Sequence, residues 1–96
     1  MESILQENKN HCFLCNGTSE PLDKHHIFNA SNRDLSEKYG LFVYLCHYSC
    51  HIFGKNSVHK NNAVAYELKQ KAEKEAMQRY GWSVEEFIKI FGRNYI

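Results

Sequence analysis

Cysteines and histidines are the residues of this chain best suited to chemistry, and they are confined to its first two thirds. Among 96 residues there are four cysteines and six histidines, all between positions 11 and 59. The cysteines form two pairs, Cys12-x-x-Cys15 and Cys46-x-x-x-Cys50. Because Zn²⁺ takes four Cys or His ligands in a tetrahedron, two such pairs brought together by folding predict a structural zinc site.

Two other interpretations of the cysteines stay open. Cys12 and Cys15 are too close in sequence for an ordinary structural disulfide, and a disulfide framework requires an oxidising compartment. Four buried thiols without a metal are the second alternative, since the 30 residues between the pairs exceed the roughly 15–20 of the common zinc-finger pattern. A metal suits a chain of this length, because so small a domain buries only roughly 60–65% of its surface on folding and a zinc site adds folding free energy.

The histidines outnumber what one tetrahedral zinc site needs. His25 and His26 are adjacent in an expected strand, where consecutive side chains point to opposite faces, so that one can bind a metal ion while the other stays free. A histidine has an unperturbed pKa of about 6.5, which suits a general base. A hydrolytic metal site needs such a base and an ion with positions open to water and substrate. The surplus therefore predicts a second, hydrolytic metal site.

The order of these motifs resembles that of the HNH endonucleases, the ββα-metal nucleases, in the branch whose zinc is held by four cysteines. The resemblance covers residues 12–62 and rests on the segments CFLC, DKHHIF, LCHYSCH and SVHKNN. A likeness to small HNH-type proteins of bacteriophages and prophages of Gram-positive bacteria extends to the last residues. It rests on HHIF, SEKYGLFVYLC, VH and IFGRNYI.

The resemblance implies an α+β fold, namely a small zinc-stabilised ββα-metal (His-Me finger) core with added C-terminal helices. Residues 1–96 are then a single domain, in which 12–62 hold the zinc knuckles and the ββα-metal motif and 63–96 form a helical extension. The implied activity is metal-dependent hydrolysis of DNA phosphodiester bonds, by nicking or by double-strand cleavage. Its products carry 5′-phosphate and 3′-hydroxyl ends.

The same resemblance assigns roles to the histidines. His26 is implied as the general base, which takes a proton from the attacking water. A divalent ion, either Mg²⁺, Mn²⁺, Ni²⁺ or Zn²⁺, is implied to stabilise the charge that builds on the phosphate and on the leaving 3′ oxygen. The implied ligands of this ion are His25, His51 and His59.

Two departures from the family pattern leave alternatives at the site. His51 and His59 are eight residues apart, so the chain must turn between them, and His47 is the substitute ligand. The family's central asparagine, which holds the loop between the strands, is missing from its usual place before the second cysteine pair. Asn29 or Asn32 is the candidate to take over this task.

Overall charge does not support nucleic-acid binding by itself, because the net charge is only +1 at pH 7. Nucleic-acid binders usually carry a basic patch, so local cations must supply the field, and Lys24, Arg33 and Lys55 are the candidates. The expected partner is DNA, and phage replication, recombination or packaging proteins and a second copy of the chain are further candidates. The alternatives to a nuclease are a non-catalytic, zinc-stabilised nucleic-acid-binding or adaptor module and a subunit of a phage complex.

The elements that must position these residues can be read from apolar patterns and turn residues. The expected order is a strand over 23–28, a loop with one helical turn over 34–39, a buried strand over 41–45, a helix over 62–80 and a last helix after Ser83. The strand over 41–45 is a continuous apolar run, the helix over 62–80 has apolar residues four positions apart, and Ser83 with Glu86 forms a capping box. Residues 1–11 are polar and are expected to be loose.

No membrane segment is expected. The longest stretch without Lys, Arg, Asp or Glu runs from Tyr39 to Gly54 and is shorter than the roughly 18–20 residues that a membrane helix needs. The first ten residues have acidic side chains where a signal peptide needs cations, and they lack its apolar run. The predicted location is the cytoplasm, in a bacterial host cell if the chain is encoded by a phage.

Overall fold

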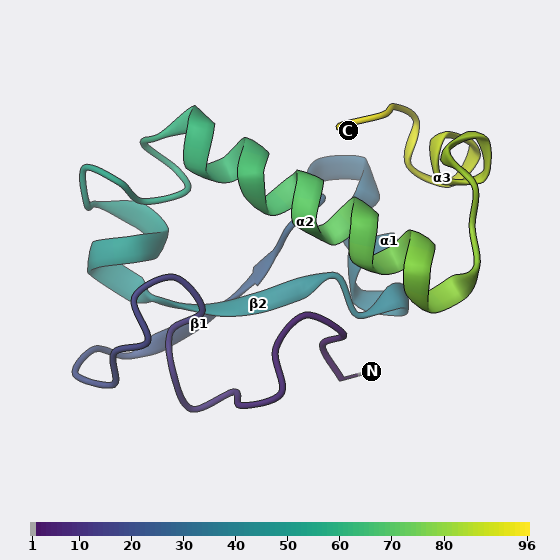
Figure 1. Ribbon diagram of the computed structural model, residues 1–96. Coiled ribbons are helices and arrows are strands. Elements are labelled where there is room, and N and C mark those ends of the chain that lie inside the picture. The colour runs from purple at the N-terminus through teal and green to yellow at the C-terminus, as the bar shows by residue number, and fades with distance from the viewer. Residues whose placement is uncertain (1) are drawn as a thin grey trace.

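The computed structural model describes residues 2–96, in which two short antiparallel strands form a sheet (Figure 1). Strand β1 (Leu22–His26) pairs with β2 (Phe42–Cys46), and the register sets His25 opposite Val43. Helices pack beside this sheet, so the architecture is α+β, as predicted. The finer prediction of a ββα-metal core is taken up with the proposed function.

Strand β1 ends at His26, two residues before the predicted end at position 28. The backbone N–H of Ile27 donates to the carbonyl of Leu41, which lies before β2, at 3.1 Å. This bond continues the register of the two strands by one pair beyond β1. Phe28 then bonds the Ser36 side chain instead of a strand partner, so the ladder ends although both apolar side chains are buried.

The connection between the strands contains more helix than the single turn predicted over 34–39. A 3-10 turn, η1 (Ala30–Asn32), leads into α1 (Arg33–Tyr39). The buried hydroxyl of Ser36 donates to the carbonyl of Phe28 at 2.6 Å and accepts from the Phe28 N–H at 3.0 Å. Gly40 ends α1 at φ 74°, in the left-handed region that favours glycine. Helix α1 is thus tied to the end of β1.

Residues 1–11 were expected to be loose, but within the described residues 2–11 the chain is bonded to β2. The Ser3 hydroxyl donates to the carbonyl of Phe42 at 2.6 Å, and the Gln6 side-chain carbonyl accepts from the Tyr44 N–H at 2.8 Å. The Ile4 N–H donates to a carbonyl just before β2, and the Ile4 side chain packs on the core. Figure 1 shows this segment running along β2. Side-chain hydrogen bonds to strand backbone explain why a polar segment is ordered.

A π-helical segment, η2 (His47–Ile52), follows β2 directly and leads into a tight turn. At Gly54 the chain passes so close to itself that an added Cβ would lie 1.9 Å from the Ser49 carbonyl oxygen. The backbone N–H groups of Val58 and His59 then donate to the carbonyls of Cys50 and His51, at 2.9 and 3.2 Å. The turn therefore brings the segment before α2 back beside η2.

The two C-terminal helices begin as predicted. Helix α2 (Asn62–Tyr80) has the predicted bounds, and the Asn61 side chain caps its first turn. Helix α3 (Val84–Phe91) begins with the predicted capping box between Ser83 and Glu86. Nothing in the described helices is long and apolar enough to cross a membrane.

The core lies between the sheet and the two C-terminal helices. Its fully or nearly fully buried members from the sheet and from these helices are Val43, Leu45, Leu68, Ala72, Ala76, Phe87 and Phe91. Phe28 packs against the α3 rings, with its ring centre 4.7 Å from that of Phe91. The exception in this core is Glu73, a buried carboxylate of α2 that the apolar pattern did not reveal. Its Oε1 accepts a hydrogen bond from the Tyr95 N–H at 2.7 Å.

Candidate metal centres

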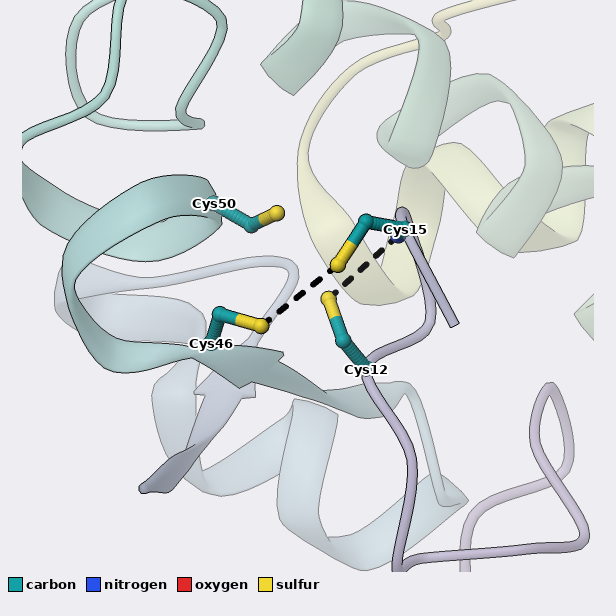
Figure 2. A group of neighbouring side chains, drawn as sticks. All are labelled: Cys12, Cys15, Cys46 and Cys50. Atoms are coloured by element: carbon teal, nitrogen blue, oxygen red, sulfur yellow. Dashed lines mark hydrogen bonds between the residues drawn. The ribbon is translucent and has the colours of Figure 1, made fainter. Parts of the chain in front are cut away.

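The four cysteines form one cluster, as predicted. Cys12 and Cys15 come from the loop before β1, Cys46 ends β2 and Cys50 lies in η2. Their sulfur atoms all lie within 4.8 Å of one another, and Figure 2 shows the side chains directed toward a common centre. Tetrahedral Zn–S bonds of about 2.3 Å set the sulfurs about 3.8 Å apart, and Cys15 Sγ lies 3.5 Å from Cys46 Sγ. All four are free thiols, and the cluster can hold a structural zinc ion.

The backbone around the first knuckle is arranged to stabilise a thiolate. Burial by itself raises the pKa of Cys12, but hydrogen bonds from the backbone N–H groups of Cys15, Cys46 and Leu14 lower it to about 7. Burial and the neighbouring thiols raise the pKa of Cys46 to about 12 and that of Cys50 above its usual value. Since thiolates at this separation repel one another, the cluster needs a cation to be fully ionised.

Three histidines form a second cluster beside the first. His25 from β1, His51 from η2 and His59 from the segment before α2 each offer a nitrogen, and these nitrogens lie within 4.8 Å of one another. The Nε2 atoms of His51 and His59 are 3.2 Å apart. Tetrahedral Zn–N bonds of about 2.0–2.1 Å set two ligand nitrogens about 3.3 Å apart. The donor set therefore fits a divalent metal ion.

Burial favours the neutral, metal-binding form of two of these imidazoles, those of His25 and His59. His25 is buried, and this burial together with the nearby His51 and His59 lowers its pKa to about 3. Burial and His51 also lower the pKa of His59. A metal ligand must be unprotonated, so His25 is ready to bind over the physiological pH range.

The turn at Gly54 explains how His51 and His59 meet across eight residues. The predicted alternative ligand, His47, does not join the cluster. Its Nδ1 lies 2.5 Å from Asp23 Oδ2, and the same oxygen lies 2.9 Å from His51 Nδ1. Hydrogen bonds from these two histidines lower the pKa of Asp23, although burial opposes the shift. The Asp23 carboxylate therefore leaves His51 Nε2 as the atom facing the cluster, which is the usual arrangement behind a metal-binding histidine.

His26 points to the other face of β1 and makes different contacts, as the alternation of a strand requires. Its Nε2 lies 2.8 Å from Glu37 Oε1, and Arg33 Nε donates to its Nδ1 at 3.4 Å. The Lys24 ammonium bonds both Glu37 oxygens, at 2.9 and 3.2 Å. The His26 and Lys24 hydrogen bonds lower the pKa of Glu37 to about 2. An ionised Glu37 only accepts, so the proton of His26 sits on Nε2 and its lone pair on Nδ1.

Both groups of histidines border one cavity of about 330 Å³. Its lining consists of Lys24, His25, His26, Asn29, Arg33, His51 and His59. Two of the three predicted nucleic-acid-binding cations are in this lining, whereas Lys55 lies outside it, in the turn after η2. Asn29 is also in the lining, while Asn32 donates to the carbonyl of Phe91 at 2.9 Å. Of the two asparagines predicted to replace the missing central asparagine, Asn29 is therefore the one that borders the cavity.

Sequence reasoning missed Asp23 and Glu37. Asp23 could have been found, because it lies two residues before His25 in a strand and so shares its face. Glu37 had no such signal, since its contact with His26 depends on how α1 folds back on β1.

Comparisons with protein-family models, with curated proteins and with solved structures gave no match.

Proposed function

We propose that this protein is a metal-dependent endonuclease that hydrolyses DNA phosphodiester bonds. The observation that carries the proposal is that one cavity is lined both by the three-histidine cluster and by His26. His25 of the cluster and His26 are neighbours at the end of β1. Phosphodiester hydrolysis needs both parts, a metal ion and a base, within reach of one phosphate. The proposal includes a ββα-metal core made of β1, β2 and the start of α2.

His26 acts as the general base through Nδ1. Glu37 accepts from Nε2–H at 2.8 Å and fixes both the tautomer and the orientation of the ring. Nδ1 then takes the proton from a water molecule in the cavity, and Glu37 stabilises the imidazolium that forms. The contact from Arg33 to Nδ1, at 3.4 Å, is long. Arg33 exchanges it for a phosphate oxygen when substrate is present.

The cations of the cavity hold the phosphate backbone. The Arg33 guanidinium matches two phosphate oxygens, while Lys24 contributes a point charge at the cavity wall. Both side chains line the cavity, so they supply locally the positive field that the net charge of +1 does not.

His25, His51 and His59 would hold the divalent ion. When bound there, such an ion supplies electrostatic stabilisation of the charge that builds on the phosphate and on the leaving oxygen. Three neutral imidazoles suit Zn²⁺, Ni²⁺ or Mn²⁺ better than Mg²⁺. Three protein ligands also leave coordination positions for water and substrate.

One observation favours the alternative of a non-catalytic adaptor in a phage DNA-processing complex. The exposed rings of Tyr48 and Phe53, 54% and 58% exposed, stack with their centres 6.0 Å apart beside the second cysteine pair. Exposed aromatic residues are enriched at interfaces. The two rings would contact a partner protein, and such binding would not involve the histidine cavity, whose lining does not include them.

A plasmid cleavage assay tests the proposal. The zinc-loaded protein is incubated with supercoiled plasmid and Mg²⁺, Mn²⁺, Ni²⁺ or chelator. We expect nicked or linear DNA that depends on added metal, and a loss of about 100-fold or more in rate for His26→Ala, as for removal of a general base. His11→Ala, which removes a histidine outside the cavity, should cleave like the unaltered chain.

Two outcomes would count against the endonuclease. Absence of cleavage with every ion, by protein whose zinc content and circular dichroism are normal, would favour the adaptor. Cleavage that persists unchanged in His26→Ala would show that His26 is not the base.

A further inference from the structure

A second cavity, of about 260 Å³, lies between the start of α2 and the C-terminal residues. It is lined by Asn62, Ala65, Tyr66, Lys69, Arg93 and Tyr95. Two of these six residues are cationic, two are tyrosines and none is acidic. A concave surface that combines cations with aromatic rings is the usual composition of a site for a single nucleic-acid strand, in which cations contact phosphates and rings stack on bases.

Tyr95, one of the two aromatic residues of this cavity, is held in place by hydrogen bonds to α2. The backbone of Tyr95 donates to Glu73 at 2.7 Å and accepts from the Gln70 side chain at 2.9 Å. The Arg93 guanidinium lies 4.7 Å and the Lys69 ammonium 5.6 Å from the centre of the Tyr95 ring. The cations are therefore gathered over one fixed ring, and little ordering is needed before a ligand binds.

The ring of Tyr66 remains available for stacking. Tyr66 is 38% exposed, and its ring centre lies 5.8 Å from that of Tyr95 in an edge-on arrangement. Tyr66 therefore lines the cavity and is partly accessible to a ligand. An unpaired base can stack on an accessible ring, whereas a base inside a duplex cannot.

One short connection and two contacts place this cavity near the histidine cavity. Asn62 follows His59 by three residues, which span at most about 11 Å. Asn32, next to Arg33 of the first cavity, bonds the carbonyl of Phe91 at 2.9 Å, two residues before Arg93. The ring of Phe28, next to Asn29, lies 5.4 Å from that of Tyr95. The proximity of Lys69 also contributes to the low pKa of His25.

We propose that the second cavity binds the single-stranded nucleic acid that continues from the histidine cavity, with Lys69 and Arg93 on its phosphates and Tyr66 stacked on a base. This inference rests on the proposed endonuclease function and adds to it a preference for substrates with an unpaired strand next to the cleaved bond. One strand would then contact Lys24 and Arg33 in the first cavity and Lys69 and Arg93 in the second.

Binding of a short fluorescein-labelled oligothymidine strand, followed by anisotropy, tests the proposal without any need for cleavage. The zinc-loaded chain is compared with Lys69→Gln/Arg93→Gln and with the charge-matched control Lys74→Gln/Lys89→Gln, whose lysines are exposed and outside both cavities. We expect the first double variant to bind about 10-fold or more weakly. Its plot of log affinity against log salt should lose about 1.4 in slope, at about 0.7 for each lost phosphate contact of a single strand.

A second variant tests the stacking. Tyr66→Ala leaves the charge unchanged, and we expect about a 10-fold loss of affinity with the salt slope retained. Equal binding by Lys69→Gln/Arg93→Gln and its control would overturn the proposal, as would failure of the unaltered chain to bind the strand. Displacement of the strand by free thymidine monophosphate at equal nucleotide concentration would also overturn it, because the site would then take a mononucleotide.

The outcome is separable from that of the plasmid assay. Loss of strand binding in Lys69→Gln/Arg93→Gln together with an inactive unaltered chain would contradict the endonuclease and support a nucleic-acid-binding module. Cleavage of plasmid with no effect of these substitutions on strand binding would contradict only the second cavity.

Discussion

Asp23 shares one carboxylate oxygen between His47 and His51, and so acts on the histidine cluster without belonging to it. Such a carboxylate fixes the tautomer and the orientation of a ligating imidazole. In Asp23→Asn the amide can present either its oxygen or its NH₂ to His51 and carries no charge. We expect the affinity of the three-histidine cluster for Ni²⁺ or Mn²⁺ to fall about 10- to 100-fold, measured by calorimetric titration of protein whose cysteine cluster is already loaded with zinc.

Asp34→Asn provides the matched control for this substitution. Asp34 is an exposed aspartate on α1 that lies outside the histidine cavity, so its loss removes the same charge without touching His51. If both variants bound metal like the unaltered chain, Asp23 would have no orienting role, and its contacts with the histidines would serve only the fold.

Residues of the site could be predicted where few kinds of chemistry use their side chain, as for cysteine and histidine. Two clusters were predicted and are found: the four cysteines, and His25 with His51 and His59. The catalytic role of His26 stays a prediction. Glu37 could not be found from the sequence, because a glutamate in a polar helix is ordinary and its partner lies 11 residues away.

Among the elements, α1 is joined to the residues that follow β1 by one buried hydroxyl, in addition to the ion pairs of Glu37 with β1. Ser36 is fully buried and pairs with both backbone groups of Phe28. In Ser36→Ala these two groups lose their partner in a site closed to water. We expect the free energy of unfolding to fall by about 2–6 kcal/mol, taking about 1–3 kcal/mol for each of the two unsatisfied buried groups, measured by urea denaturation of the zinc-loaded protein.

If the proposed cleavage occurs, Ser36→Ala should also lower its rate at a temperature where the variant is still folded. The reason is that α1 carries both Arg33 and Glu37. Ser31→Ala, at an exposed position of the same connection, is the control and should change stability by less than about 0.5 kcal/mol. A stability of Ser36→Ala equal to that of the control would mean that water or another group satisfies the Phe28 backbone.

The elements themselves were predicted unevenly, for reasons that lie in how each is stabilised. Helix α2 has an apolar stripe and a capping residue within its own sequence, and its bounds were predicted correctly. Helix α1 and the N-terminal segment are held by contacts with residues distant in the sequence, such as Ser36 with Phe28 and Ser3 with Phe42. Local sequence patterns do not contain those contacts. The length of α1 was therefore underestimated, and the N-terminal segment was wrongly expected to be loose.

The molecule as a whole is small enough for its stability to depend on the cysteine cluster. Structural zinc sites contribute about 10–16 kcal/mol of apparent binding free energy in small domains, which is comparable to the entire stability of an ordinary domain, about 5–15 kcal/mol. We expect a strong chelator to abolish most of the folded far-ultraviolet circular dichroism of the protein, and added Zn²⁺ to restore it.

A variant with an incomplete histidine cluster shows which site is responsible. His59→Ala removes one of the three clustered imidazoles and leaves the cysteines in place, so its loss of structure on chelation should match that of the unaltered chain. Full retention of structure after chelation, with zinc shown to be gone, would instead support four buried thiols that need no metal.

For the whole molecule, the α+β class implied by the resemblance is found, but the relation between its parts was not predicted. The two cavities border residues from β1, the α1 connection, η2, α2 and the C-terminal residues. Their proximity depends on contacts such as that of Asn32 with Phe91, across 59 residues. Contacts at this separation are set by packing of the core, and the local patterns of a single sequence give no sign of them.

The N-terminal segment along β2 has a consequence for how this protein behaves at high concentration. An uncovered edge strand offers unpaired N–H and C=O groups to other chains and is a common starting point for aggregation. On the outer edge of β2, the Phe42 carbonyl and the Tyr44 N–H are bonded to Ser3 and Gln6, and the Tyr44 carbonyl accepts from the Phe13 N–H at 2.8 Å. The chain thereby blocks its own most apolar strand from pairing with a neighbour, and the sheet stays at two strands.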